Sequence, residues 1–400
     1  MNGLETIAVV GASLAGVRSV QALRREGFGG RIVLVGAEQH WPPFDRPPLS
    51  KQVLTGDWPA DKARLRVGEV FHAELVLGRR AVSLDIAAGE VRLDDESVLA
   101  FDGLVVATGA SPRILPGAQP MDGVHVLRTV DDALALRIDL QSATRVAVIG
   151  AGFIGSEVAS SCRALGLDVT LIEALDLPLA RILGPAMGEV AAALHRAHGV
   201  TLRLAVGVRS VVAGADARVE ALTMSDGTSV SADVVVVGIG VTPTTGWLEG
   251  SGLVLDDGVV CDEACVAVGS DGRAVAAGDV ARWHNPLFDQ SMRVEHWTNA
   301  SDQAAHAARA LLRGAREAGA FAPVPYFWSD QHGTKLQFVG TSAATDDVVV
   351  VEGSIDDGKF VAGYGRDGVT VGALCVNWPA RMVPWSRAIA EQTPAFSVDV

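Results

Sequence analysis

Cysteine is scarce in this chain of 400 residues. The four cysteines, Cys162, Cys261, Cys265 and Cys375, are too few for the disulfide framework of a small secreted fold. Cys261 and Cys265 form the string CDEAC, which is too widely spaced for a CxxC redox motif and has no pair of histidines nearby for zinc. The sequence therefore predicts neither a disulfide-stapled scaffold nor a metal centre.

Positive charge and long apolar runs are also missing. The 33 basic and 47 acidic residues give a formal net charge of −14, which disfavours nonspecific binding to nucleic acid or to an anionic membrane. The strongest apolar run, Val234–Val241, has eight residues, whereas a bilayer span needs roughly 20. The opening residues MNGLETIAVVGAS lack the basic and then apolar stretches of a secretory signal. We therefore expect a cytoplasmic protein that binds no nucleic acid and no membrane.

Glycine, in contrast, is abundant, with 44 residues, and it marks an internal repeat. The segment IAVVGASLAGVRSVQALRREG from Ile7 is similar to VAVIGAGFIGSEVASSCRALG from Val146, at an offset of 139 residues. Each copy opens with an apolar strand, passes through a Gly-rich turn into a helical pattern, and returns to a second strand, Ile32–Val35 or Val169–Ile172. Two βαβ units of this kind predict two bound dinucleotides.

The second copy carries a complete GxGxxG pattern at Gly150, Gly152 and Gly155. The first glycine permits a tight turn, the second lets the backbone approach a pyrophosphate, and the third allows the helix to pack closely on the strand. The helix N-terminus adds about half a positive elementary charge. Glu173 ends the next strand, where its carboxylate suits ribose hydroxyls and repels a 2′-phosphate, and no arginine is among the next three residues. We therefore predict NADH rather than NADPH.

The first copy departs from this pattern. Ser13 replaces the middle glycine between Gly11 and Gly16, which the turn tolerates if the φ angle of Ser13 stays negative. Gly36 ends the following strand, where the second copy has a glutamate, and Glu38 lies two residues further on. We predict that Glu38 binds the ribose of the first dinucleotide. The alternative is that Glu38 is a solvated loop residue.

The rest of the chain completes an α/β fold. The segments that end at Ala107–Gly109 and at Ala276–Ala281 have the character of further strands of the first sheet, so the first domain is predicted to be discontinuous. From Ala320 onward, strand patterns with glycine turns and a final helical stretch predict a smaller α+β domain. The predicted fold class is therefore α/β, with two Rossmann-like dinucleotide-binding domains and a C-terminal α+β domain.

Four further strings resemble a known family. They are WPPFDRPPLSK (Trp41–Lys51), LRT (Leu127–Thr129), VEHWTNA (Val294–Ala300) and YFWSDQ (Tyr326–Gln331). Together with the repeat, they resemble the FAD-dependent NADH:ferredoxin reductases of bacterial cytochrome P450 and Rieske oxygenase systems, over essentially the whole chain. This resemblance implies an FAD-binding domain at 1–112 and 246–320, an NAD-binding domain at 113–245, and a C-terminal reductase domain at 321–400.

The resemblance also implies the residues of the sites. For FAD these are Gly11, Ser13, Ala15, Gly16, Glu38, Arg46, Lys51, Val82, Ala107, Thr108, Gly109, Arg128, Gly278, Asp279, Trp297 and Trp328. For NAD they are Gly150, Gly152, Phe153, Ile154, Gly155, Glu157, Glu173 and Gly240. Lys51 and Glu157 are expected to pair beside the reacting rings, and they are the catalytic candidates.

The residues themselves support these roles unequally. Lys51 is one of four lysines beside 29 arginines, and a compact charge suits the anion that develops on a reduced flavin, with a solvated loop lysine as the alternative. Glu157 falls in a first helical turn, where the helix dipole favours a carboxylate in any case. Asp279 also suits a helix N-cap, and Trp297 and Trp328 also suit a core.

The cysteines separate this family from its relatives, which include the disulfide reductases. Those enzymes need a redox pair on the helix after the first dinucleotide unit, but no cysteine precedes Cys162. We therefore predict hydride transfer from NADH to FAD, followed by transfer of single electrons to a [2Fe-2S]-type ferredoxin, with no side chain acting as nucleophile or general base.

The predicted partner is thus a ferredoxin and, indirectly, a cytochrome P450 or Rieske oxygenase, and the chain is expected to be a monomer or weak homodimer. Because such ferredoxins are acidic, a local basic patch is needed, and Arg309, Arg313 and Arg316 are the candidates, with an ordinary solvated helix as the alternative. Two other functions stay open here. They are a reductase for rubredoxin or another small redox protein, and an NADH-sensing flavoprotein similar to apoptosis-inducing factor.

Overall fold

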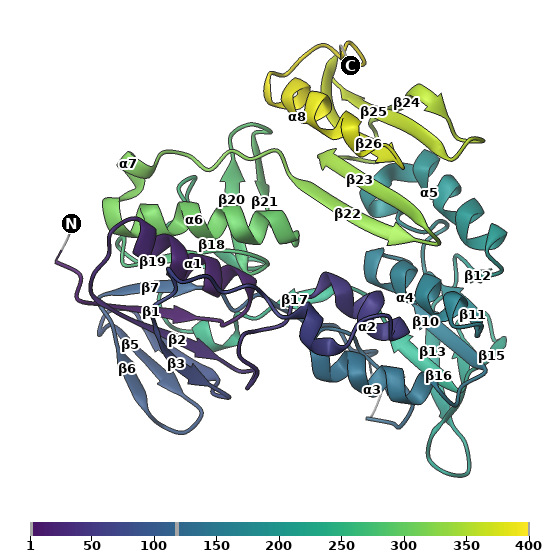
Figure 1. Cartoon of the computed structure of the whole chain (residues 1–400), viewed down its shortest axis with the longest axis horizontal. Helices are drawn as coiled ribbons and strands as arrows, with labels where there is room; N and C mark the ends of the chain where they lie inside the picture. Colours follow the sequence, from purple (N-terminus) through teal and green to yellow (C-terminus); the bar gives the residue numbers. More distant parts are fainter. Residues whose placement is uncertain (1–2, 117–119, 399–400) are drawn as a thin grey trace. The chain divides into compact units, whose positions relative to one another are not determined.

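The computed structural model describes residues 3–116 and 120–398, which divide into two compact units. The first unit runs to Asp45 and also contains Arg64–Ser111 and Thr242–Pro325. The second contains Arg46–Ala63, Pro112–Val241 and the chain from Tyr326 onward. The Pro-rich loop from Arg46 therefore groups with the second unit, although its sequence position lies inside the predicted FAD-binding domain. Figure 1 shows the elements of both units.

A parallel five-stranded sheet forms the centre of the first unit. Its order is β19-β7-β1-β2-β3, with strands β1 (Thr6–Val10), β2 (Arg31–Gly36), β3 (Glu74–Leu77), β7 (Gly103–Val106) and β19 (Ala274–Ala276). The prediction that distant segments add strands to the first sheet is confirmed, because β7 precedes Ala107–Gly109 and β19 leads into the AAGD string. Helices α1 (Leu14–Arg25) and α6 (Trp297–Arg313) pack side by side (Figure 1).

Two smaller sheets complete the first unit. One is antiparallel and contains β4 (Ala81–Asp85), β5 (Glu90–Leu93) and β6 (Val98–Ala100). The other contains β18 (Val259–Cys261), β20 (Ala281–Asn285) and β21 (Gln290–Met292).

The second unit repeats the parallel architecture. Its sheet has the order β12-β11-β10-β16-β9, with β9 (Val124–His125), β10 (Arg145–Ile149), β11 (Asp168–Ile172), β12 (Thr201–Arg203) and β16 (Val234–Val237). The helices are α3 (Val130–Leu140), α4 (Phe153–Ala164) and α5 (Ala180–Ala197), and an antiparallel sheet adds β13 (Val208–Ala213), β14 (Val219–Met224) and β15 (Ser229–Ser231). The Pro-rich loop contributes the 3₁₀ turn η1 (Pro47–Ser50) and the short helix α2 (Gln52–Thr55).

The C-terminal part of the second unit is a five-stranded antiparallel sheet with one helix. The order is β22-β23-β26-β25-β24, from β22 (Tyr326–Gln331), β23 (Thr334–Gly340), β24 (Asp347–Ser354), β25 (Lys359–Arg366) and β26 (Val369–Val376), and the helix is α8 (Met382–Ala390). The predicted fold class, two Rossmann-like domains with a C-terminal α+β domain, is confirmed. No helix among the described residues is long and apolar enough to cross a membrane.

The C-terminal sheet and helix α5 share one hydrophobic core, which contains Leu183 and Met187 of α5 and Phe338 and Tyr364 of the sheet. Helix α5 is interrupted at Gly184, whose φ of 73° is followed by Pro185. The interruption frees carbonyl groups that a continuous helix would satisfy. Tyr364 Oη donates to Leu183 O at 2.7 Å, and Ser342 donates to Ile182 O, so the C-terminal sheet supplies the missing partners.

Candidate functional site

The Gly-rich turn of the second repeat has one glycine that faces open space. A Cβ on Gly150 would lie 2.3 Å from Gly238 O in the segment after β16, and a Cβ on Gly155 would lie 1.9 Å from Gly150 O, so close packing requires both glycines. A Cβ on Gly152 would meet nothing within 4 Å. Because Gly152 begins the helix at its N-cap, the free space lies where a pyrophosphate would meet the helix N-terminus. The turn therefore fits a dinucleotide.

Glu173 is held beside this turn. Its Oε2 accepts a hydrogen bond from Ala151 N at 2.7 Å, and its Oε1 accepts one from Leu175 N at 3.0 Å. These bonds fix the carboxylate at the end of β11, on the side of the sheet where the turn lies. The position agrees with the predicted role of binding ribose hydroxyls.

Three other residues predicted for NAD surround the same helix N-terminus. Phe153 opens α4 and its ring centroid lies 4.3 Å from that of Phe327. Ile154 is 38% exposed, so part of its surface is open to a ligand. Gly240 follows β16, the neighbour of β10 in the sheet, and its φ of 94° with open space around the Cβ position allows a close backbone approach.

The turn of the first repeat has the same packing. A Cβ on Gly11 would lie 2.0 Å from Ala107 O, which places the Ala107–Gly109 segment directly against the motif, and a Cβ on Gly16 would lie 1.7 Å from Gly11 O. Ser13 has a φ of −95°, so the condition for tolerating a side chain at this position is met. Its side chain makes no capping hydrogen bond to α1.

The AAGD segment approaches the same turn from β19. A Cβ on Gly278 would lie 3.1 Å from Ala15 Cβ of α1 and 3.6 Å from Ala300 Cβ of α6. The N-terminal turns of two helices therefore lie on either side of Gly278. Two helix N-termini at one place favour a doubly charged pyrophosphate more than one does. The first repeat thus also fits a dinucleotide, as FAD requires.

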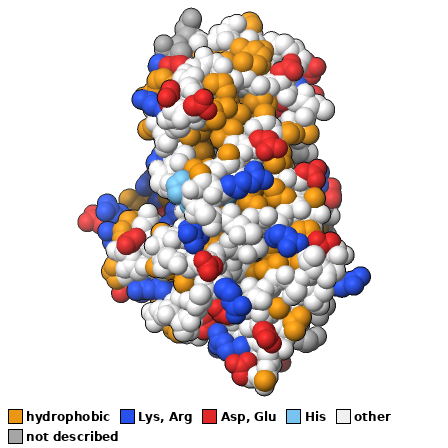
Figure 2. Space-filling model, turned by 90° about the vertical axis from the view of Figure 1, so that its right-hand side faces the viewer, with side chains coloured by type: hydrophobic (Ala, Val, Ile, Leu, Met, Phe, Trp, Pro, Cys, Tyr) orange, Lys and Arg blue, Asp and Glu red, His pale blue; other side chains and the backbone are white. Residues whose placement is uncertain are grey.

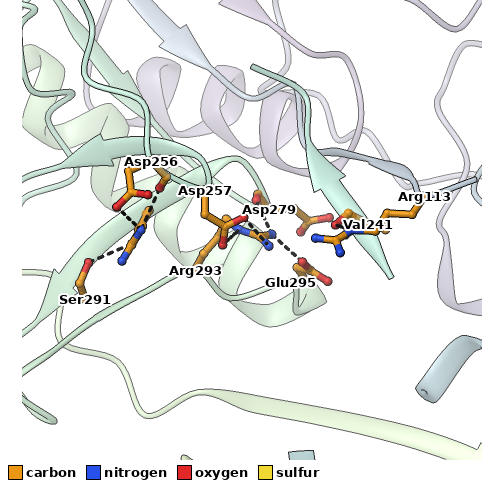
Figure 3. Close-up of polar contacts among 9 residues, drawn as sticks. Arg113, Val241, Asp256, Asp257, Asp279, Ser291, Arg293 and Glu295 are labelled. Atoms are coloured by element: carbon orange, nitrogen blue, oxygen red, sulfur yellow. Dashed lines mark hydrogen bonds and ion pairs between the residues drawn. The ribbon is translucent and has the colours of Figure 1, made fainter. Parts of the chain in front are cut away.

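Two side chains hold the main chain that carries Asp279. Gln303, which is fully buried in α6, accepts a hydrogen bond from Gly278 N at 2.9 Å. Arg293 Nη1 donates to Asp279 O at 3.1 Å, and the guanidinium also forms ion pairs with Asp257 and Glu295 (Figure 3). The predicted cofactor residue Asp279 therefore lies in a turn that is fixed on both sides.

The departures of the first repeat have a packing cause. A Cβ on Gly36 would lie 2.4 Å from Ala12 Cβ, so no glutamate fits at the end of β2.

Glu38 lies two residues after β2 and is partly buried. Val82 lies in β4 with 48% of its surface exposed. The roles of Glu38 and Val82 toward FAD stay predictions.

Lys51 and Glu157 meet in the second unit, as expected from the resemblance. Lys51 Nζ lies 2.6 Å from Glu157 Oε2, and the two side chains are 12% and 6% exposed. Glu157 lies in the first turns of α4, and Lys51 joins η1 to α2. Ser161 of α4 donates to Ser50 O at 2.7 Å, which fixes the Pro-rich loop on the helix.

Glu157 accepts two further hydrogen bonds that were not predicted from the sequence. Ser50 Oγ donates to Oε2 at 2.5 Å, and Ser329 Oγ donates to Oε1 at 2.8 Å. Gln331 Nε2 donates to Ser329 Oγ at 3.0 Å. A signal was present in the string FWSDQ, because Ser329 and Gln331 share the strand face of Phe327 and are therefore polar residues on a buried face.

The remaining predicted residues fall into two groups. In the second unit, Arg46 donates to Arg128 O, so the Pro-rich loop and the LRT segment are in contact. Trp328 lies on the face of β22 opposite Ser329, where it is partly buried and stacks with Tyr326 at 6.1 Å between ring centroids. In the first unit, Trp297 is the first residue of α6, and its Nε1 donates a hydrogen bond to Asp45 Oδ1 at 2.7 Å. Their contacts to a flavin stay predictions.

All four cysteines are buried and unpaired. Burial raises the pKa of the Cys162, Cys265 and Cys375 thiols to about 12 and that of Cys261 well above its usual value. Since the thiolate is the reactive form, burial disfavours redox chemistry at all four sulfurs. Among the described residues, no group of three or more histidine, cysteine, aspartate or glutamate side chains is placed to hold a metal ion. The absence of a metal site stays a prediction from the sequence.

The candidate docking arginines on α6 have partners of their own. Arg309 Nε lies 3.1 Å and Arg313 Nη2 lies 2.5 Å from the carboxylate of Glu26, and Arg313 also pairs with Glu317. On the face drawn in Figure 2, basic and acidic side chains are interspersed rather than gathered by sign. The docking role of Arg309, Arg313 and Arg316 stays a prediction.

Comparison with known proteins gives the family. Residues 5–304 match the family model described as pyridine nucleotide-disulphide oxidoreductase, and residues 326–399 match the model described as reductase C-terminal. The chain belongs to the pyridine nucleotide-disulphide oxidoreductase family, whose members use FAD and NAD(H). Within this family it groups with the ferredoxin reductases of cytochrome P450 and dioxygenase systems, so the prediction from its motifs is confirmed.

The similar proteins match along nearly their whole lengths. The chain is 38% identical to rhodocoxin reductase of Rhodococcus erythropolis, with 97% of this chain and 90% of that one covered. It is 40% identical to the ferredoxin–NAD(+) reductase component of the anthranilate 1,2-dioxygenase system of Burkholderia cepacia, with 93% and 91% covered. Among solved structures, the covalent putidaredoxin reductase–putidaredoxin complex contains a chain with a TM-score of 0.91 at 33% identity, with 98% and 94% covered.

Proposed function

We propose that this protein is the reductase component of an oxygenase system, which takes electrons from NADH and passes them singly to a [2Fe-2S]-type ferredoxin. The function is supported by relatives that are ferredoxin reductases over nearly their whole lengths. The structural observation that carries it is the buried Lys51–Glu157 pair, with Glu157 on the helix that opens at the NAD turn.

The protein's own residues bind and orient the two nucleotides and exclude water from them. FAD, when bound, supplies the ability to accept two electrons as hydride and to release them one at a time. The helix N-terminus at Gly152 and the carboxylate of Glu173 hold NADH by its pyrophosphate and ribose. Lys51 supplies a fixed positive charge toward the anion that hydride transfer creates, and Glu157 keeps its ammonium group in place. No proton abstraction from carbon is needed, so no general base is required.

A reduction assay tests this function. The protein, saturated with FAD, is mixed with NADH without oxygen, and the flavin absorbance is expected to bleach in a single phase. Addition of an oxidised [2Fe-2S] ferredoxin is expected to restore the absorbance, with two ferredoxins reduced for each NADH. Absence of bleaching would contradict the proposal. A reduced state that persists in air and with ferredoxin would favour the NADH-sensing alternative. Faster reoxidation by rubredoxin than by ferredoxin would indicate that rubredoxin is the electron acceptor.

The predictions of a cytoplasmic location and of a monomer or weak homodimer stay predictions. The preference for NADH over NADPH is likewise proposed here from Glu173.

A further inference from the structure

The contact between Glu157 and the C-terminal domain has no part in the function described so far. Ser329 Oγ donates to Glu157 Oε1 at 2.8 Å, and Ser329 itself accepts a hydrogen bond from Gln331 Nε2 at 3.0 Å. Ser329 and Gln331 are both fully buried on β22. Two consecutive hydrogen bonds, from Gln331 to Ser329 and from Ser329 to Glu157, therefore connect the C-terminal sheet with the carboxylate that pairs with Lys51.

These polar residues lie on an apolar surface. Phe327 shares their face of β22 and packs on Phe153 of α4, and burial of a hydroxyl and an amide there costs free energy unless both find partners. An apolar side chain at position 329 would pack better against this surface. Because Ser329 donates its single hydroxyl proton to Glu157, we infer that the hydrogen bond to this carboxylate is the role of the serine.

The contact fixes the orientation of the carboxylate. Ser50 and Lys51 both donate to Oε2, whereas Ser329 is the donor to Oε1 among the residues that the structure describes. The terminal torsion of a glutamate is broad, so a carboxylate held at one oxygen can rotate. With both oxygens held, Oε2 stays directed at Lys51.

We propose that Ser329 of the C-terminal domain, supported by Gln331, is a positioning residue for Glu157 and, through it, for Lys51. This proposal rests on the proposed function, in which Lys51 serves hydride transfer. It gives the C-terminal domain a part in the reaction with NADH.

The test compares three variants of the FAD-bound protein. Ser329→Ala removes the donor, and Ser329→Thr restores a hydroxyl. Ser342→Ala is the matched control, because it removes another hydrogen bond from the C-terminal domain to the NAD-binding part, the one to Ile182 O. The measurements are the rate of flavin reduction at saturating NADH, the dissociation constant of NADH, and the flavin midpoint potential, determined by photoreduction without NADH.

Ser329→Ala is expected to reduce flavin about tenfold more slowly, with little change in NADH affinity. Its flavin potential is expected to be more negative, because a less firmly held Lys51 stabilises the reduced flavin less. Ser329→Thr is expected to recover most of the rate, and Ser342→Ala to match the unmodified protein. Equal rates and potentials in Ser329→Ala and the unmodified protein would overturn the proposal, as would equal losses in Ser329→Ala and Ser342→Ala.

Failure of the proposed function would look different. In that case NADH would not bleach the flavin of the unmodified protein, whereas the potential measured by photoreduction would still report whether Ser329 acts on Lys51.

Discussion

Lys51 Nζ lies 2.6 Å from Glu157 Oε2, although 106 residues separate the two in the chain. Both side chains are nearly buried. Removal of one partner from such a pair leaves the other charge buried without compensation, so it is expected to cost more free energy than removal of one partner from an ion pair at the surface.

The first prediction concerns Lys51. Lys51→Met is expected to lower the rate of flavin reduction by NADH about 100-fold, because a fixed charge toward the developing anion is lost. Stopped-flow absorbance of the flavin measures this rate. Lys62→Met is the matched control, since Lys62 lies on the ring of Trp58 in the same segment and is exposed. Equal rates of flavin reduction in Lys51→Met and Lys62→Met would show that Lys51 does not contribute to hydride transfer.

The second prediction concerns the choice of nucleotide. Glu173→Gln keeps an acceptor for Ala151 N but removes the negative charge, so repulsion of a 2′-phosphate falls. We expect the ratio of kcat/KM for NADPH to that for NADH to rise about tenfold. Steady-state assays with ferricyanide measure both constants. Glu189→Gln, at an exposed position of α5, is the control and should leave the ratio unchanged. A constant ratio in Glu173→Gln would argue against its contact with ribose.

The third prediction concerns retention of FAD. Gln303→Leu leaves Gly278 N buried without its acceptor and loosens the turn that carries Asp279. The dissociation constant for FAD is expected to rise about tenfold, which titration of the FAD-free protein by flavin fluorescence measures. Gln290→Ala, exposed on β21, is the control. Unchanged FAD affinity in Gln303→Leu would show that this turn does not determine binding.

The fourth prediction tests the docking arginines. Although burial opposes it, the hydrogen bond from Arg309 and the charge of Arg313 hold the pKa of Glu26 below its usual value, so Glu26 neutralises part of their charge. Glu26→Gln is therefore expected to lower the KM for an acidic ferredoxin a few-fold at low ionic strength, and Arg309→Glu with Arg313→Glu to raise it. Ferricyanide reduction should not change. Equal changes in both assays would assign these residues another role.

The fifth prediction concerns pH and three histidines between α5 and the C-terminal sheet. His195 Nδ1 lies 3.0 Å from His332 Nε2, and the ring of His198 stacks on His332. Burial lowers the pKa of His195 to about 3 and, with the charges of His198 and Arg163, that of His332 to about 4. The unfolded chain therefore binds more protons than the folded one between about pH 6.5 and 4, so stability is complete above this range and falls as pH decreases through it.

Thermal unfolding between pH 7.5 and 5 checks this sign. The unfolding temperature is expected to fall by a few degrees, and less steeply in His332→Gln. His72→Gln, exposed in the first unit, is the control. An identical slope in His332→Gln and the unmodified protein would show that the histidines do not cause the loss.

Much of the fold was predictable because it depends on local geometry. Gly11 and Gly150 have φ angles of 115° and 95°, and a Cβ on Gly155 would meet Gly150 O within the same turn, so the two repeats are visible in the sequence. The Lys51–Glu157 pair came from resemblance alone, because no local pattern links residues so far apart. Gln303 had a local signal, since it lies on the same buried stripe of α6 as Ala300 and Ala307, but its partner Gly278 comes from another strand.

Other features could not be read from the chain. The grouping of Arg46–Ala63 with the second unit depends on contacts with α4 that have no pattern in the loop itself. Glutamate does not fit at position 36 because of Ala12, which lies close to Gly36 in space. The position of Ala12 follows only from the three-dimensional structure of the Gly-rich turn after β1.

The break in α5 has a consequence for engineering. Leu183 O and Ile182 O receive their donors from Tyr364 and Ser342, so neither the helix nor the sheet is a self-contained module. A chimera that exchanged only the segment from Tyr326 onward with a homologue would graft foreign side chains onto these carbonyls. A transferable cassette would have to include α5 as well.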